Sequence, residues 1–151
     1  ALLDIDTAHN YGRLLEDLWP TVDVRDPIGD FYRRYPPGHL YGTGVDDLDV
    51  GEDGGSAELD QLDAIREGGD GAQPAYLGGQ VDLDGVDPDE AWVVAAVDGV
   101  VQGFSRLFAM LDTDRAFSIL LDQDVVGGEG HAIDLYVLES PTGPLHPLDL
   151  P

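Results

Sequence analysis

The stretch Trp92-Val-Val-Ala-Ala-Val-Asp-Gly-Val-Val-Gln-Gly-Phe-Ser-Arg-Leu-Phe108 decides the fold class of this 151-residue chain. It joins two segments rich in β-branched and aromatic residues, 91–97 and 100–108, through the dipeptide Asp98-Gly99. Asp-Gly accepts a positive φ at both central positions of a type I′ turn, and the twist of that turn matches the twist of two antiparallel strands. The stretch therefore predicts a β-hairpin.

Three further strands are expected around this hairpin, over residues 75–82, 116–121 and 133–138. Apolar and polar residues tend to alternate there, and Gly-rich or Asp-rich turns lie between the segments. No connection contains a helix long enough for a parallel crossover, so the strands are expected to pair antiparallel. The predicted fold is mainly β, an antiparallel β-sandwich or curled sheet of about five or more strands with an N-terminal helix.

The rest of the chain divides into three segments around a β domain over residues 74–139. Residues 1–43 are expected to hold a helix, capped by Asp6 or Thr7 and ended by Pro20, together with turns. Its apolar residues recur with helical spacing, and their common face would cover the sheet; they are Tyr11, Leu14, Leu15 and Leu18. Residues 44–73 predict an acidic, Gly-rich spacer with a short helix over 58–66, and residues 140–151 predict a Pro-rich tail.

The charge of the chain is strongly one-sided. There are 31 acidic residues against 7 basic ones, all arginine, for a formal net charge of -24. Phosphate backbones and anionic membranes both require a basic surface, so binding to nucleic acid and direct contact with such a membrane are not expected. Self-repulsion of this size is tolerated where salt screens it, which favours a halophilic, salt-tolerant surface. The one basic pair, Arg33-Arg34, is expected to form local ion pairs with Asp26 and Asp30.

Calcium is the cofactor that the acidic residues first suggest. The segment from residue 81 to 90 carries four aspartates at short spacing, namely Asp82, Asp84, Asp87 and Asp89. An EF-hand loop requires a ligand at position 5 and glycine at position 6, whereas Val86 and Gly85 stand at positions 5 and 4. These aspartates remain candidate ligands for a calcium site of another kind. The alternative interpretation is an ordinary solvated turn.

The sequence contains no recognisable catalytic motif. It has no cysteine, no serine in a Gly-x-Ser-x-Gly context, no HExxH and no Gly-rich nucleotide-binding loop. The aromatic residues of the predicted strands are interpreted as core, with a carbohydrate-binding platform as the alternative; they are Trp92, Phe104, Phe108, Phe117 and Tyr136. We therefore expect a protein that is not an enzyme, and an unfamiliar carboxylate active site is the further alternative.

Five segments, in this order, carry a resemblance to a known family. They are Pro37-Gly-His-Leu-Tyr-Gly42, Pro74-Ala-Tyr-Leu-Gly-Gly-Gln-Val81, the hairpin described above, Arg115-Ala-Phe-Ser-Ile-Leu-Leu121 and Asp134-Leu-Tyr-Val-Leu138. Together they resemble the C-terminal extracytoplasmic region of actinobacterial sulfatase-like membrane proteins of the alkaline-phosphatase superfamily. Asp98-Gly99 stands where that family has an Asn-Gly turn, and Ser105-Arg106 where it has a Thr-Arg pair. The catalytic motifs of the family have no counterpart here.

This resemblance implies a non-catalytic accessory or interaction domain of a larger membrane-anchored protein. The expected partners are an upstream catalytic domain of the same polypeptide and a cell-surface polymer. The expected location is the extracytoplasmic face of the membrane, to which the parent protein would tether the domain. The alternative function is a calcium-dependent or carbohydrate-binding β-sandwich module.

Overall fold

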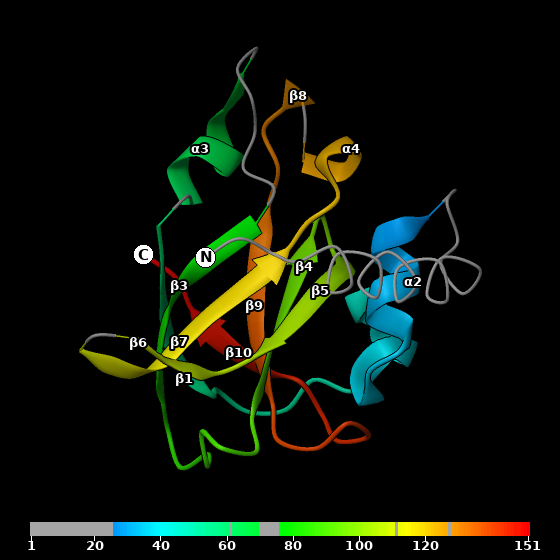
Figure 1. Cartoon of the computed structure of the whole chain (residues 1–151). Helices are drawn as coiled ribbons and strands as arrows, with labels where there is room; N and C mark the ends of the chain where they lie inside the picture. The colour runs from blue at the N-terminus through cyan, green and yellow to red at the C-terminus, as the bar shows by residue number, and fades with distance from the viewer. Residues whose placement is uncertain (1–25, 61, 70–75, 111, 127) are drawn as a thin grey trace, which may run out of the picture.

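A computed structural model describes residues 26–60, 62–69, 76–110, 112–126 and 128–151 (Figure 1). The helix predicted around Tyr11 and Leu18 lies outside these residues. Eight strands form one sheet in the order β5-β4-β9-β10-β1-β3-β7-β6, and β2 and β8 form a second, two-stranded sheet. The fold is therefore mainly β, as the sequence predicted.

The elements follow one another along the chain with short connections. The helical elements are α2 (Pro27–Arg33), η2 (Pro36–Leu40), η3 (Val45–Asp47), α3 (Leu62–Glu67) and α4 (Gln123–Val126). The strands of the large sheet are β1 (Gly55–Leu59), β3 (Tyr76–Leu83), β4 (Trp92–Val97), β5 (Val100–Arg106), β6 (Phe108–Met110), β7 (Thr113–Leu120), β9 (Ile133–Leu138) and β10 (His146–Asp149). The small sheet pairs β2 (Gly68–Gly69) with β8 (Gly128–Glu129).

The hairpin that the sequence predicted is formed by β4 and β5. Asp98 and Gly99 both have positive φ, 51° and 81°, as a type I′ turn requires. The Asp98 carboxylate also reaches across to the chain before β9, where it accepts a hydrogen bond from the Ala132 amide at 2.9 Å and contacts His131 Nδ1 at 2.7 Å. The turn is thus tied to the strand that pairs with β4 on its other side.

These contacts predict a pH-dependent contribution of Asp98 to stability. The hydrogen bonds from His131 and Ala132 lower the pKa of Asp98 below its ordinary value of 3.8. A lowered pKa stabilises the folded state above the unfolded pKa, and this contribution disappears as the pH falls through the folded pKa. Asp98→Asn keeps a residue that suits the turn but removes the charge. We expect it to lower the urea midpoint slightly at pH 7, and we expect this difference from the wild type to disappear as the pH falls through the lowered pKa of Asp98. If the urea midpoints of Asp98→Asn and the wild type still differ at acid pH, the charge of Asp98 is not the cause of the difference.

Four strands lie in segments where the sequence predicted none: the short β2 and β8 of the small sheet, and β1 and β10 of the large sheet. β1 falls within the expected spacer, and β10 within the expected Pro-rich tail. β10 pairs antiparallel with β9 and parallel with β1, so it occupies the middle of the sheet. The expectations that residues 133–138 are the last strand and that all pairs are antiparallel were therefore wrong. β10 has only four residues, one of them Pro147, and so short a segment shows no alternation that could outweigh this proline.

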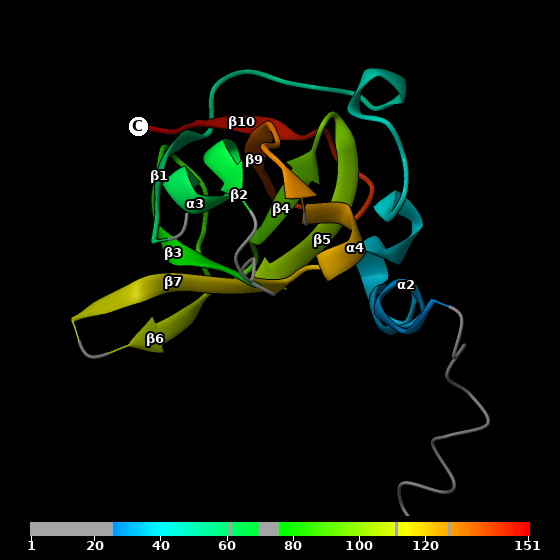
Figure 2. The same ribbon diagram turned by 90° about the horizontal axis from the view of Figure 1, so that it is seen from above.

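The sheet curls until its two ends approach each other (Figure 2). The Ser118 amide of β7 donates to Ser105 Oγ of β5 at 3.4 Å, although these strands are not neighbours in the sheet. Gly103 of β5 allows the approach, because a Cβ there would lie 2.6 Å from the side chain of Ile119. The curled sheet encloses buried apolar side chains from both halves, among them Leu77, Val93, Phe117, Ile119, Leu135 and Val137.

The α2 helix packs against β5 and β7. The Asp26 side chain caps it by accepting from the Gly29 amide at 3.0 Å, and Pro27 opens it. The predicted local ion pairs are confirmed: Arg33 lies 3.1 Å from Asp26, and Arg34 lies 2.8 Å from Asp30. On the side facing the sheet, Tyr32 is buried against Phe104, with ring centroids 4.8 Å apart. Every residue of β4 is buried, on both faces of the sheet.

Candidate functional site

A groove lined mainly by aromatic side chains runs between α2 and the line where β5 meets β7. Its volume is about 540 Å³. We call it the aromatic groove, and its lining residues are Phe31, Tyr32, Tyr35, Tyr76, Trp92, Phe104, Ser105, Arg106, Ser118 and Leu120. They come from α2 and the residues directly after it, and from four strands. The size lies in the range of small-molecule sites, which are concave and mostly apolar with a few polar groups.

The floor of the aromatic groove is buried and its rim is exposed. On the floor, Trp92 and Phe104 are 7% and 4% exposed and pack edge to face with centroids 5.4 Å apart. On the rim, Phe31, Tyr35 and Tyr76 are 43%, 44% and 49% exposed. Phe31 packs edge to face on Tyr35 at 5.3 Å, which limits the rotamers of both rings. Three large ring surfaces are therefore open to solvent on a preorganised base.

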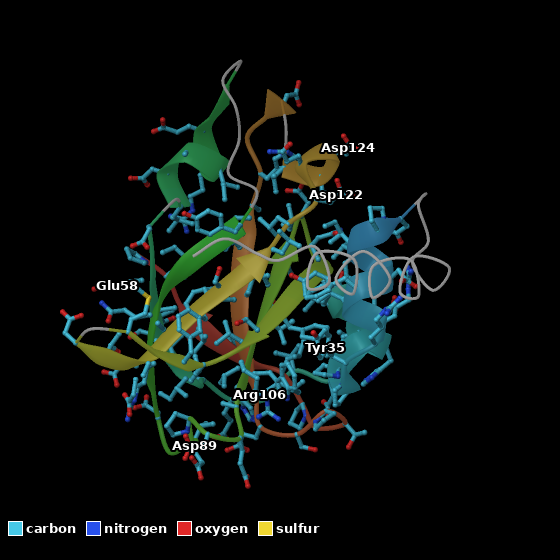
Figure 3. All side chains as sticks on the ribbon, viewed as in Figure 1. Tyr35, Glu58, Asp89, Arg106, Asp122 and Asp124 are labelled. Carbon is cyan, nitrogen blue, oxygen red and sulfur yellow. The ribbon has the colours of Figure 1, made fainter. Side chains whose placement is uncertain are left out.

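Among the described residues that line the aromatic groove, Arg106 is the one that carries a charge. Its guanidinium lies 4.2 Å from the centre of the Trp92 ring, and its Nη1 donates to the Asp89 carbonyl at 3.2 Å. The two contacts hold the cation over the face of the indole. Figure 3 shows Arg106 and Tyr35, the latter on the rim of the same groove. With Ser105 and Ser118, Arg106 supplies the polar groups that could orient a ligand.

A second groove of about 430 Å³ lies on the outer face of β1, β3, β6 and β7. Glu58, Asp60 and Asp112 contribute carboxylates to it, and Phe108 and Met110 of β6 contribute exposed apolar surface. We call it the acidic groove. It shares Tyr76 and Ser118 with the aromatic groove.

The four calcium candidates do not converge. Asp82 pairs with Arg115 at 3.3 Å, and Asp84 lies beside it on a shallow cleft of about 180 Å³. The Asp87 side chain accepts from the Asp89 amide at 3.0 Å, which is the geometry of a solvated turn. Within the described ranges, no three His, Asp or Glu side chains are grouped so that they could hold a metal ion. Calcium binding at this turn stays a prediction, because these four aspartates are not arranged as a set of calcium ligands.

The five aromatic residues considered in the sequence separate into different surroundings. Trp92, Phe104 and Phe117 are buried, so their interpretation as core is confirmed. Phe108 is 41% exposed on the acidic groove. Tyr136 is partly buried, packs against the core and lines neither groove.

The exposed rim of the aromatic groove was not identified from the sequence. Phe31 and Tyr35 belong to a short aromatic stretch before two prolines, and Tyr76 begins a strand more than 40 positions later. No spacing rule links these positions. The only available signal was that Phe31 and Tyr35 lie next to turns and outside the predicted strands, whereas Tyr76 falls inside the predicted strand 75–82.

No protein-family model, curated protein or solved structure matches this chain. The resemblance to sulfatase-like proteins therefore stays a prediction. Among the helices in the described part of the chain, none is both long and apolar enough to cross a membrane.

Proposed function

We propose that this chain is a non-catalytic binding module and that its aromatic groove takes uncharged sugar rings. The observation that carries the proposal is the set of three exposed rings, Phe31, Tyr35 and Tyr76, around a floor of Trp92 and Phe104. A pyranose ring presents C–H groups of slight positive charge on one face, and the face of an aromatic ring is negative. Sugar rings therefore stack on such side chains, while their hydroxyl groups bond to polar neighbours.

The charges of the molecule favour an uncharged ligand over an anionic one. The net charge of -24 repels polyanions at long range where salt is low. The Arg106 guanidinium contacts the Trp92 ring and donates to the Asp89 carbonyl, and its other N–H groups can donate to sugar hydroxyl groups. The described residues that line the aromatic groove include no carboxylate or imidazole, so they offer contacts for binding rather than an acid–base pair.

The parent protein would determine what this binding achieves. In a sulfatase-like membrane protein, a module of this kind would hold a cell-surface polymer near an upstream catalytic domain on the extracytoplasmic face. The family resemblance of the sequence supports this setting, and the aromatic groove supports the contact with the polymer.

Replacing a ring on the rim is the direct test of the proposed function. The probes are α- and β-linked hexasaccharides of glucose and of N-acetylglucosamine. Binding is followed by the fluorescence of Trp92, with the other tryptophan removed by Trp19→Phe. For a hexasaccharide that binds, Tyr35→Ala should weaken affinity about tenfold, because it removes one stacking surface.

Two controls make this test decisive. Val50→Ala changes an exposed apolar residue outside both grooves and should leave affinity unchanged. Chromatography of the saccharides after long incubation should show no shortening, and cleavage would contradict a non-catalytic role. If none of the four hexasaccharides perturbs Trp92, the carbohydrate assignment is wrong.

A further inference from the structure

We infer that the aromatic groove and the acidic groove form one continuous track that binds an extended oligosaccharide rather than a single sugar. This inference rests on the proposed function and specifies its ligand. The two grooves meet at Tyr76 and Ser118, which line both of them. In the view of Figure 3, Glu58 of the acidic groove and Tyr35 of the aromatic groove lie on either side of β7.

Small residues line the sheet at the junction between the grooves, and the Tyr76 ring lies close over one of them, Gly78. Gly78 of β3 stands directly opposite Ser118 of β7, and Gln80 stands opposite Ala116, on the outer face of the sheet. A Cβ at Gly78 would lie 3.3 Å from the Tyr76 ring and 3.7 Å from Asp60 Oδ2. Any larger side chain at position 78 would therefore fill the space between these two groups. The exposed Tyr76 ring stands at this junction, where a bound chain would pass from one groove to the other.

The chemistry of the acidic groove fits the polar edges of the same chain. Glu58, Asp60 and Asp112 offer ionised oxygens, which accept strong hydrogen bonds from hydroxyl groups. Phe108 and Met110 offer apolar surface for a ring face, with 41% and 54% of their areas exposed. Alternating hydroxyl edges and apolar faces are characteristic of a sugar chain. The three carboxylates disfavour a polyanionic chain.

Chain length separates this inference from the proposed function. The disaccharide and the hexasaccharide of one linkage series are compared by titration calorimetry. We expect the hexasaccharide to bind at least about tenfold more tightly, because two linked contacts are made at the entropic cost of one association. Phe108→Ala should remove most of that advantage and leave disaccharide affinity unchanged. Tyr35→Ala should weaken both ligands, and Val50→Ala neither.

A second variant tests the junction itself. Gly78→Val should lower hexasaccharide affinity to that of the disaccharide while circular dichroism shows an unchanged fold. If Gly78→Val disturbs the fold, the effect of Phe108→Ala on hexasaccharide affinity is the test of the continuous track. Equal affinity for both chain lengths, with no effect of Phe108→Ala, would overturn the continuous track and leave sugar binding in the aromatic groove intact. If neither saccharide binds but a basic peptide does, both proposals are overturned.

Discussion

A chain that ends at Ser140 is expected not to fold. The deleted residues include β10, which lies between β9 and β1 in the large sheet. Without it, the sheet separates into β5-β4-β9 and β1-β3-β7-β6, and the inner strands β9 and β1 each lose a hydrogen-bonded neighbour. Leu145 and Leu148 would leave the core, where they are 1% and 5% exposed. The measurement is thermal unfolding by circular dichroism, which should show no cooperative transition.

Two point variants give the same test in a full-length chain. Leu148→Ala removes a buried side chain and should lower the free energy of unfolding by about 2–5 kcal/mol. Asp149→Ala is the matched control at the next, exposed position and should change it by less than about 0.5 kcal/mol. If the truncated chain unfolds cooperatively with the wild-type midpoint, the segment is a tail after all and its place in the sheet is refuted.

We expect the attachment of α2 to the curled sheet to depend most on Tyr32. Its ring is 2% exposed and contacts Phe104 of β5, while its hydroxyl donates to the Leu120 carbonyl of β7 at 2.5 Å. One side chain thus joins the helix to both strands at the line where the sheet nearly closes. Burial raises the pKa of Tyr32 far above that of an exposed tyrosine, so the hydroxyl keeps the proton it donates.

Two substitutions separate the contribution of the Tyr32 ring from that of its hydroxyl. Tyr32→Ala should destabilise the fold by about 3–5 kcal/mol, because it leaves a cavity under α2. Tyr32→Phe should cost about 1–3 kcal/mol, because the Leu120 carbonyl loses its partner. Both values are measured by urea denaturation at neutral pH. Tyr35→Phe, at an exposed ring three positions on, is the control and should cost less than about 0.5 kcal/mol. Equal losses for Tyr32→Phe and Tyr35→Phe would show that the buried hydrogen bond contributes nothing.

Much of the local structure could be predicted because its causes are local. Asp98-Gly99 specifies its turn through the φ values that the two residues tolerate, and Arg33 and Arg34 lie within one or two helical turns of their acidic partners. The strands β3, β4, β5, β7 and β9 carry enough apolar and β-branched residues to be recognised within a few positions. The short helix over 58–66 was recognised as well, although Glu58 and Leu59 belong to β1 and the helix runs from Leu62 to Glu67.

The candidate site was much less predictable. Trp92, Phe104 and Phe108 were considered as a possible platform, but Trp92 and Phe104 form a buried floor rather than an exposed surface. The exposed rings Phe31, Tyr35 and Tyr76 meet only because α2 packs beside the ends of β3 and β5. Whether an aromatic side chain lies in the core or on a rim depends on which other elements pack over it. A local sequence pattern does not show which elements these are.

The sequence by itself determined that this protein is acidic, mainly β and centred on an Asp-Gly hairpin, because composition, alternation and turn chemistry act over a few neighbouring residues. Only the tertiary structure decided that β1 and β10 complete the sheet, that their pairing is parallel, and that β5 approaches β7. These contacts join residues tens of positions apart, and each depends on the whole sheet curling around one core. Both grooves are consequences of that curl, because they lie where distant strands and α2 come together.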